Sequence, residues 1–284
     1  MAANNKGTEK SVPINFNYNE DNMSYAQTAY GRVYMDSDGN LYPSASTIPS
    51  YGIPKPPYLI KWLVERSNGD YDKFLNLQSW ESRLGSAVHN LCEQWLLGNK
   101  IDLTSNDVND YCDTTGVIAP LDGVIQIRKA VQAFIAFWEL NQPELISTEQ
   151  LVWGQSKDDD GNIIYPFAGR IDIVARIDGK IWILDIKTSK TVADVINYQV
   201  QLGIYKLLYE DMTGEEVHGI GIIWAKKDFL NAAPPKSVLS IIKYKFDEEL
   251  IWDTYKMFQR VYKGLNPRHH IAAQSAAQVY ERNV

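Results

Sequence analysis

Two aspartates and one lysine lie in the segment GRIDIVARIDGKIWILDIKTS, where their types and spacing could hold a metal ion. Runs rich in Ile and Val flank Asp178-Gly179, and an Asp-Gly pair between such runs is a strong signal for a two-residue hairpin turn. Counting outward from that turn, Asp172 faces Asp185, and opposed residues of an antiparallel pair share one face of the sheet. Lys187, two residues beyond Asp185, projects from the same face. The pattern therefore predicts two carboxylates and an ammonium group in one place.

A divalent cation would resolve the repulsion that two opposed carboxylates create in a sheet. Mg²⁺ prefers oxygen ligands and keeps several of its waters, so positions remain for a phosphate oxygen and an attacking water. That combination is the basis of metal-assisted phosphodiester hydrolysis. The alternative is a solvated sheet face on which Asp172 and Asp185 are exposed and Lys187 is a surface partner. The apolar residues 181–184 before Asp185 favour a central strand, where charges need a reason, so we favour the metal site.

The elements that must position these residues follow from hydrophobic periodicity. Leu84, Val88, Leu91 and Trp95 recur at helical spacing, which is typical of an amphipathic helix. The predicted helices cover residues 57–66, 80–98, 123–141, 191–211 and 247–263. Three strands or more are predicted over residues 145–187, and two further strands over 217–226 and 238–246. This order predicts an α/β fold with a central mixed β-sheet flanked by helices.

The chain is predicted to form one large domain between two irregular ends. The predicted parts are a flexible polar arm (1–24), one domain (25–265) with a helical N-terminal part (about 42–141) and a core (about 145–263), and a C-terminal tail (266–284). The arm is Asn-rich and polar, which is typical of chain that does not pack into a core. Within the domain, residues 30–42 are predicted to be a hairpin that turns at Asp38-Gly39.

The overall composition limits the class of protein. The net charge of −7 counts against a protein that coats nucleic acid by bulk electrostatics, but leaves room for an enzyme with one local basic groove. Cys92 and Cys112 are too few for a four-thiolate zinc site or a four-cysteine iron–sulfur cluster, and we expect both to be reduced. The sequence has no apolar run of ~18 residues and no apolar signal-peptide region, so we expect a cytoplasmic protein without a membrane partner.

Four short motifs occur in order along the chain. They are G-x-x-x-H at Gly85–His89, G-x-x-D at Gly169–Asp172, D-x-K-T at Asp185–Thr188 and Q-x-x-x-Y at Gln201–Tyr205. Each motif is weak alone, but the four in this order resemble the RecB-like exonuclease branch of the PD-(D/E)xK nuclease superfamily. The leader YPSASTIP and the following LIKWLVER are similar to mitochondrial genome maintenance exonucleases and related phage nucleases. The resemblance covers about residues 42–210 and implies a restriction-endonuclease-like core.

The resemblance implies a metal centre for one or two Mg²⁺ or Mn²⁺ ions. Its ligands would be the side chains of His89, Asp172 and Asp185 and the backbone carbonyl of Ile186. Asp172, Asp185 and Lys187 would be catalytic, with Lys187 orienting the water and stabilising the charge that develops on the phosphate. Without the family, a lone histidine such as His89, beside the apolar stripe of its helix, would more often be a core residue.

Further residues are implied to bind the substrate or support the site. They are Gln201, Tyr205, Glu149, Gly85 and Thr188. Gln201 and Tyr205 are four residues apart, so both point one way from their helix; without the family they would be a polar edge on a packed helix. The Pro-Asp pair for which the superfamily is named is Ile171-Asp172 in this sequence. Some relatives carry an iron–sulfur cluster, which two cysteines rule out here.

The resemblance implies a metal-dependent exonuclease that hydrolyses phosphodiester bonds of DNA, on single strands or free ends, in replication, recombination or repair. A phage-infected bacterium is one expected setting. The first alternative is a catalytically idle nuclease fold that binds DNA or assembles with proteins, but the intact set of Asp172, Asp185 and Lys187 argues against it. The second is a nuclease of other specificity, either structure-selective or RNA-directed, because substrate choice depends on the N-terminal part.

Overall fold

The computed structural model of the protein contains two sheets and six α-helices in its described part. The structure describes residues 17–18, 23–28, 31–55, 57–190, 192, 195–230, 234 and 236–264. The strands are β1 Asn17–Tyr18, β2 Ser24–Thr28, β3 Gly31–Met35, β4 Leu41–Pro43, β5 Glu144–Trp153, β6 Ala168–Ile177, β7 Lys180–Lys187, β8 Val217–Trp224 and β9 Ile242–Tyr244. The helices are α1 Thr47–Gly52, α2 Pro57–Ser67, α3 Tyr71–Leu96, α4 Gly123–Asn141, α5 Ile196–Thr213 and α6 Glu248–Gly264, with a 3₁₀ turn η1 at Val108–Asp110.

The larger sheet has the strand order β5-β6-β7-β8-β9 and is mixed, as predicted. The pair β7–β8 is parallel, with α5 between the two strands in sequence, and the other neighbours are antiparallel. The hairpin register is confirmed, because Ile177 pairs with Lys180 and Ile173 with Leu184. Asp178 and Gly179 have φ values of 51° and 75°, as a type I′ turn requires at both central residues. The strand that carries Asp185 is therefore central.

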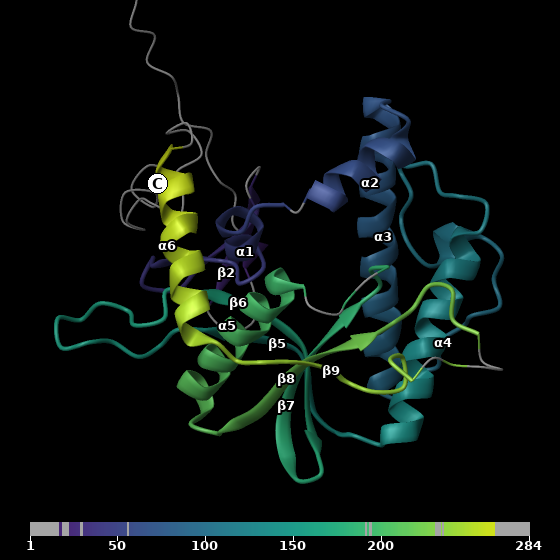
Figure 1. The fold of residues 1–284 in the computed structure, drawn as a ribbon. Coiled ribbons are helices and arrows are strands. Elements are labelled where there is room, and N and C mark those ends of the chain that lie inside the picture. The colour runs from purple at the N-terminus through teal and green to yellow at the C-terminus, as the bar shows by residue number, and fades with distance from the viewer. Residues whose placement is uncertain are drawn as a thin grey trace, which may run out of the picture.

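Helices cover both faces of this sheet (Figure 1). Successive residues of β7 point to opposite faces, so Ile183 packs in the core that contains α5, while Leu184 packs in the core that contains α3 and α4. Ile183 and Leu184 are both fully buried. Burial on two faces explains why residues 181–184 form an uninterrupted apolar run rather than an alternating one.

Some predicted boundaries were wrong. Helix α3 begins at Tyr71 rather than near residue 80, because Asp70 caps it by accepting a hydrogen bond from the Lys73 backbone N–H at 2.9 Å. The first two turns of α3 are largely exposed, so they carry no apolar stripe that the periodicity could detect. Helix α5 begins at Ile196, later than predicted, and β9 is a strand of three residues, shorter than predicted.

The smaller sheet has the order β1-β2-β3-β4. Its β3–β4 pair is the hairpin predicted over residues 30–42, with Gly39 in the turn at a φ of 83°. Asn17–Tyr18, within the predicted flexible arm, instead pair with β2 as a strand, because Tyr25 and Ser24 offer them backbone partners. The rest of the arm up to residue 22, and the tail from residue 265, lie outside the described residues. None of the described helices combines the length and apolarity needed to cross a membrane.

The helical layer makes a testable contribution to stability. Leu84 is fully buried in the core that α3 and α4 share, so Leu84→Ala should lower the free energy of unfolding by about 2–5 kcal/mol. Leu140, on α4, is 63% exposed, and Leu140→Ala should change that free energy by less than about 0.5 kcal/mol. Urea unfolding followed by tryptophan fluorescence measures both. Equal losses would contradict this description of the core.

Candidate active site

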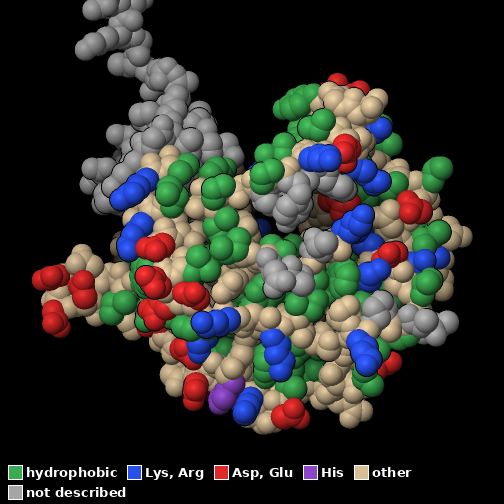
Figure 2. Space-filling model, viewed as in Figure 1, with side chains coloured by type: hydrophobic (Ala, Val, Ile, Leu, Met, Phe, Trp, Pro, Cys, Tyr) green, Lys and Arg blue, Asp and Glu red, His purple; other side chains and the backbone are tan. Residues whose placement is uncertain are grey.

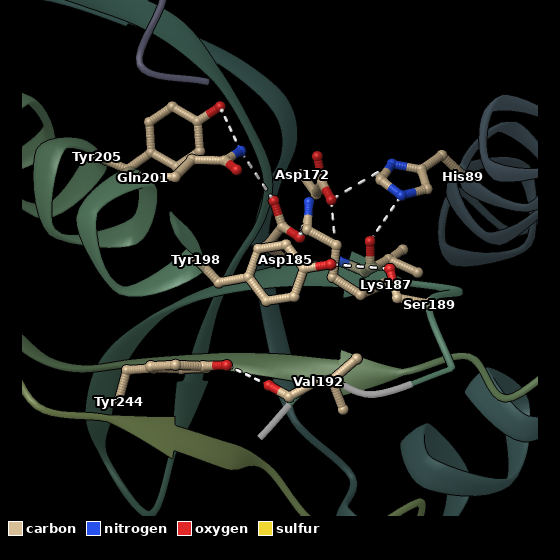
Figure 3. A network of polar contacts seen from close by, with 11 residues as sticks. His89, Asp172, Asp185, Lys187, Ser189, Val192, Tyr198, Gln201, Tyr205 and Tyr244 are labelled. Carbon is tan, nitrogen blue, oxygen red and sulfur yellow. Dashed lines mark hydrogen bonds and ion pairs between the residues drawn. The ribbon is translucent and has the colours of Figure 1, made fainter. Parts of the chain in front are cut away.

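The residues predicted to form the site converge from both faces and from the middle of the larger sheet (Figure 3). The contributing elements and residues are α3 with His89, β5 with Glu149, β6 with Asp172, β7 with Asp185, Ile186 and Lys187, and α5 with Gln201 and Tyr205. The site therefore lies where β6 and β7 end their pairing, between α3 on one side and α5 on the other.

His89, Asp172 and Ile186 contact one another. The Nδ1 atom of His89 lies 3.3 Å from Oδ2 of Asp172, and its Nε2 atom lies 2.7 Å from the carbonyl oxygen of Ile186. The backbone N–H of Ile186 donates a hydrogen bond to the same Asp172 oxygen at 2.8 Å. Three of the four predicted metal ligands are thus within direct contact distance, and His89 faces Asp172 and the Ile186 carbonyl rather than the apolar core.

Glu149 joins this group through an unusual backbone conformation. One ligand atom each from His89, Glu149 and Asp172 lie within 4.8 Å of one another. Glu149 sits in the middle of β5 with a φ of 47°, a left-handed conformation that is unfavourable for residues other than glycine. Arg170 compensates in part, because its Nη1 donates a hydrogen bond to the Glu149 carbonyl at 2.9 Å. Strained residues of this kind concentrate at functional sites.

Asp185 is held by two side chains on the other side of the site. It is 2% exposed, its Oδ2 lies 2.5 Å from the ammonium nitrogen of Lys187, and its Oδ1 accepts a hydrogen bond from Nε2 of Gln201 at 3.1 Å. The same Gln201 nitrogen lies 3.2 Å from the hydroxyl of Tyr205. Gln201 and Tyr205 therefore share one face of α5, as their spacing predicted, and they bear on a carboxylate of the site.

The crowded carboxylates favour a bound cation electrostatically. Burial, and then the charge of Asp172, raise the pKa of Glu149 to about 7. Burial and Asp172 also raise the pKa of Asp185 above its usual range. Burial alone would lower the pKa of Lys187, but the carboxylates of Asp185 and Asp172 outweigh it and the pKa is raised. Lys187 thus keeps its positive charge beside the carboxylates of Asp185 and Asp172, two acids that one ammonium group cannot fully neutralise.

A divalent metal ion fits this group of residues. Buried polar atoms are nearly always hydrogen-bonded, yet Oδ2 of Asp185 is buried and accepts no hydrogen bond of ordinary geometry from the described residues; it has only the ion pair with Lys187. The available donors are carboxylate oxygens, one carbonyl oxygen and one imidazole nitrogen. Oxygen-rich sets of this kind suit Mg²⁺ and Mn²⁺ better than metals that select thiolates.

Tyr198 and Ser189 are residues of the site that the sequence did not single out. The ammonium nitrogen of Lys187 lies 5.1 Å from the centre of the Tyr198 ring, within the range of a cation–π contact. The hydroxyls of Tyr198 and Ser189 are 2.8 Å apart, and the indole N–H of Trp224 donates to the Ser189 carbonyl at 2.8 Å. The signal that could have found Tyr198 is its spacing, three residues before Gln201 on one helix.

The two glycines at the starts of predicted motifs differ in how much room they have. A Cβ atom on Gly169 would lie 2.6 Å from Cε1 of Tyr205, so this glycine is what allows the Tyr205 ring to pack against β6. A Cβ atom on Gly85 would lie 3.9 Å from Oγ1 of Thr188, which is an ordinary contact. Gly85 is thus beside Thr188, as a supporting residue of the site would be. The space around Gly85 is nevertheless large enough for an alanine side chain.

Comparison with known proteins agrees with this geometry. The family model of the PD-(D/E)XK nuclease superfamily matches residues 61–245, which is more than half of the chain. The chain belongs to this superfamily. This PD-(D/E)XK protein is therefore a nuclease, a phosphodiester hydrolase whose substrate is nucleic acid and whose family uses divalent metal ions. Its α/β fold, a five-stranded mixed sheet flanked by helices, is consistent with the restriction-endonuclease-like core.

Other comparisons add little to the family assignment. A search of curated proteins finds no match. One similar solved structure is titled "Crystal structure of SSO0001"; it is 18% identical, with 55% of this chain and 72% of that chain covered and a TM-score of 0.28. That similarity is too low to assign a fold or an activity to this nuclease.

The contrast between the two glycines gives a prediction. Gly169→Ala should displace the Tyr205 ring and, through Gln201, loosen Asp185, so we expect nuclease activity to fall about tenfold or more. Gly85→Ala is the matched control: it has room for the methyl group and replaces a helical glycine, so activity should stay within about twofold and stability should rise slightly. Initial cleavage rates and thermal unfolding measure these effects. Equal loss of activity in both variants would contradict the packing described.

Proposed function

We propose that this nuclease is a DNA exonuclease of the RecB-like branch, acting on single strands or free ends in replication, recombination or repair. The observation that carries the proposal is the contact of His89, supplied by a helix, with Asp172 and the Ile186 carbonyl. The contact of Gln201 with Asp185 further supports it, because the Q-x-x-x-Y motif of that branch thereby reaches the site. The similarity of the segments YPSASTIP and LIKWLVER to exonucleases supports cleavage from the ends of DNA rather than at internal sites.

We assign the metal centre to the side chains of His89, Asp172 and Asp185 and the carbonyl of Ile186, with Glu149 as a supporting acid at the same group. When bound, Mg²⁺ or Mn²⁺ supplies Lewis acidity toward the phosphate and a water of lowered pKa. Of the residues named, Glu149 lies within the group of ligand atoms, where its carboxylate could accept a proton from water.

Lys187 has the task of stabilising the phosphate. Its ammonium group is fixed between the Asp185 carboxylate and the Tyr198 ring, so it needs no reorganisation when charge develops on the phosphate oxygens. Asp172 is fixed in turn by the Ile186 N–H. Because the nucleophile is water, no covalent enzyme intermediate forms in this mechanism.

The helical N-terminal part would direct the strand to the site. Figure 2 shows this face of the molecule hollowed between the column of α2 and α3 and the part of the chain that carries α1 and α6. We propose that the substrate strand enters through this hollow. A route bounded by two protein walls favours a single strand or a free end over the middle of a duplex.

The test is cleavage of end-labelled single- and double-stranded DNA and RNA, blocked at either end, with Mg²⁺, Mn²⁺ or EDTA. We expect metal-dependent degradation of DNA that stops when one end is blocked. Lys187→Ala should slow cleavage about 10²- to 10³-fold, and Asp172→Asn should slow it further, because each removes a charge that acts on the phosphate or its metal. Asp178→Asn is the matched control, since Asn-Gly also suits the hairpin turn, and should cleave like the wild type.

The alternatives give different results in the same assay. Cleavage of a covalently closed DNA circle would show that the protein is an endonuclease and would overturn the proposed exonuclease activity. Preference for RNA would overturn the choice of DNA. Unchanged cleavage by Asp172→Asn would overturn the assigned metal centre.

A further inference from the structure

Arg32 lies on the inner face of the smaller sheet. Arg32 and Tyr34 are two residues apart on β3, so their side chains leave the strand on the same side. Tyr34 is 1% exposed and packs with Leu151 and Ala168 of the nuclease core. The Arg32 side chain therefore faces the nuclease core rather than the outer surface of the sheet, and it is half-buried there.

Backbone contacts tie Arg32 to the edge of the active site. The Arg32 carbonyl accepts a hydrogen bond from Ser44 N–H at 3.1 Å, and the next residue, Ala45, donates to the carbonyl of Ala168 at 2.8 Å. Ala168 precedes the glycine against which Tyr205 packs. That glycine brings the chain of contacts to Tyr205, whose hydroxyl contacts the glutamine that holds Asp185. Arg32 is thus connected to Asp185 through a short series of contacts that ends with Gly169, Tyr205 and Gln201.

The guanidinium has few partners for its charge. Its Cζ lies 5.2 Å from the centre of the Tyr25 ring, and its Nη1 lies 3.4 Å from the Tyr34 hydroxyl. Within the described residues, no carboxylate lies at ion-pair distance from it, whereas Lys227, which follows β8 of the larger sheet, pairs with Glu81. An arginine has five N–H donors and keeps its charge at all physiological pH values. A half-buried guanidinium with most donors unused is suited to an anionic ligand.

We propose that Arg32 binds a backbone phosphate of the nucleic-acid strand, next to the phosphate that is cleaved. The inference rests on the nuclease function, since a nucleic-acid strand supplies phosphates at regular spacing. The cleaved phosphate belongs at the metal centre, and Arg32 reaches that centre only through the contacts of Gly169, Tyr205 and Gln201, so Arg32 takes a neighbouring phosphate. The planar guanidinium can bind two phosphate oxygens at once, and the Tyr25 ring holds its plane. Arg32 is a substrate-positioning residue in this account.

The experiment measures binding of a labelled single-stranded oligonucleotide by Arg32→Gln and Arg32→Lys, each in the Asp172→Asn background, between 50 and 200 mM salt. Arg32→Gln should weaken binding about tenfold or more at the lowest salt. The slope of log affinity against log salt should fall by about 0.7, because one phosphate contact is lost. Arg32→Lys keeps the charge but not the bidentate geometry, so it should weaken binding while preserving the slope. Steady-state kinetics with Asp172 intact should show a raised KM and a kcat within about twofold.

Arg176→Gln is the matched control. Arg176 lies near the hairpin turn at the far end of β6 and pairs with Glu144, so neither affinity nor slope should change. Wild-type affinity and slope in Arg32→Gln would overturn the proposal. Weaker binding with an unchanged slope would also overturn it, because it would mean a packing role. If the wild type cleaves nothing yet Arg32→Gln alters the slope, the phosphate contact holds and the proposed exonuclease activity fails.

Discussion

Repulsion among carboxylates that are buried or half-buried is the constraint on which the rest of this structure depends. Asp172 interacts electrostatically with Glu149 on one side and with Asp185 on the other, near the point where β6 and β7 stop pairing. Lys187 pairs with Asp185, and Arg170 lies near Glu149. Burying like charges is costly unless they are paired or coordinate a cation. The sheet and the helices packed on its two faces hold these acids in place. A bound divalent ion would offset the repulsion among these carboxylates and would act on the phosphate of the substrate.

The scaffold separates two tasks on two faces of one sheet. Helix α3 brings His89 against Asp172 and the Ile186 carbonyl, while α5 brings Gln201 against Asp185. The side chains of the central strand β7 point alternately to the face that α3 covers and to the face that α5 covers, so consecutive residues contact different helices. A parallel β7–β8 pair places α5 as the connection between these strands, which sets the helix across the same strand ends as the acids. The order and direction of the strands, rather than any single contact, thus place the polar side chains together beside the central strands β6 and β7.

The sequence predicted what depends on local rules and failed where tertiary structure decides. The Asp178-Gly179 turn fixed the register, which the pairing of Ile173 with Leu184 confirms. Beyond that pair the strands diverge, so the Asp172 carboxylate turns to the Ile186 N–H instead of lying opposite Asp185 in a regular ladder. The left-handed conformation of Glu149 could not be predicted, because no local signal marks such a kink in a non-glycine residue. Tyr198 was missed because its partner, the Lys187 ammonium, comes from another element.

The central claim is that this crowded acidic group is built to bind a divalent cation, and thermal unfolding tests it most directly. Wild-type protein and Glu149→Gln would be compared with EDTA and with a titration of Mg²⁺ or Mn²⁺. Removing one half-buried acidic charge should raise the Tm of the metal-free protein, whereas the metal-induced rise in Tm should be large in the wild type and reduced in the variant. No metal-induced rise in the wild type, or a Glu149→Gln protein that is less stable without metal and equally stabilised by it, would contradict the account.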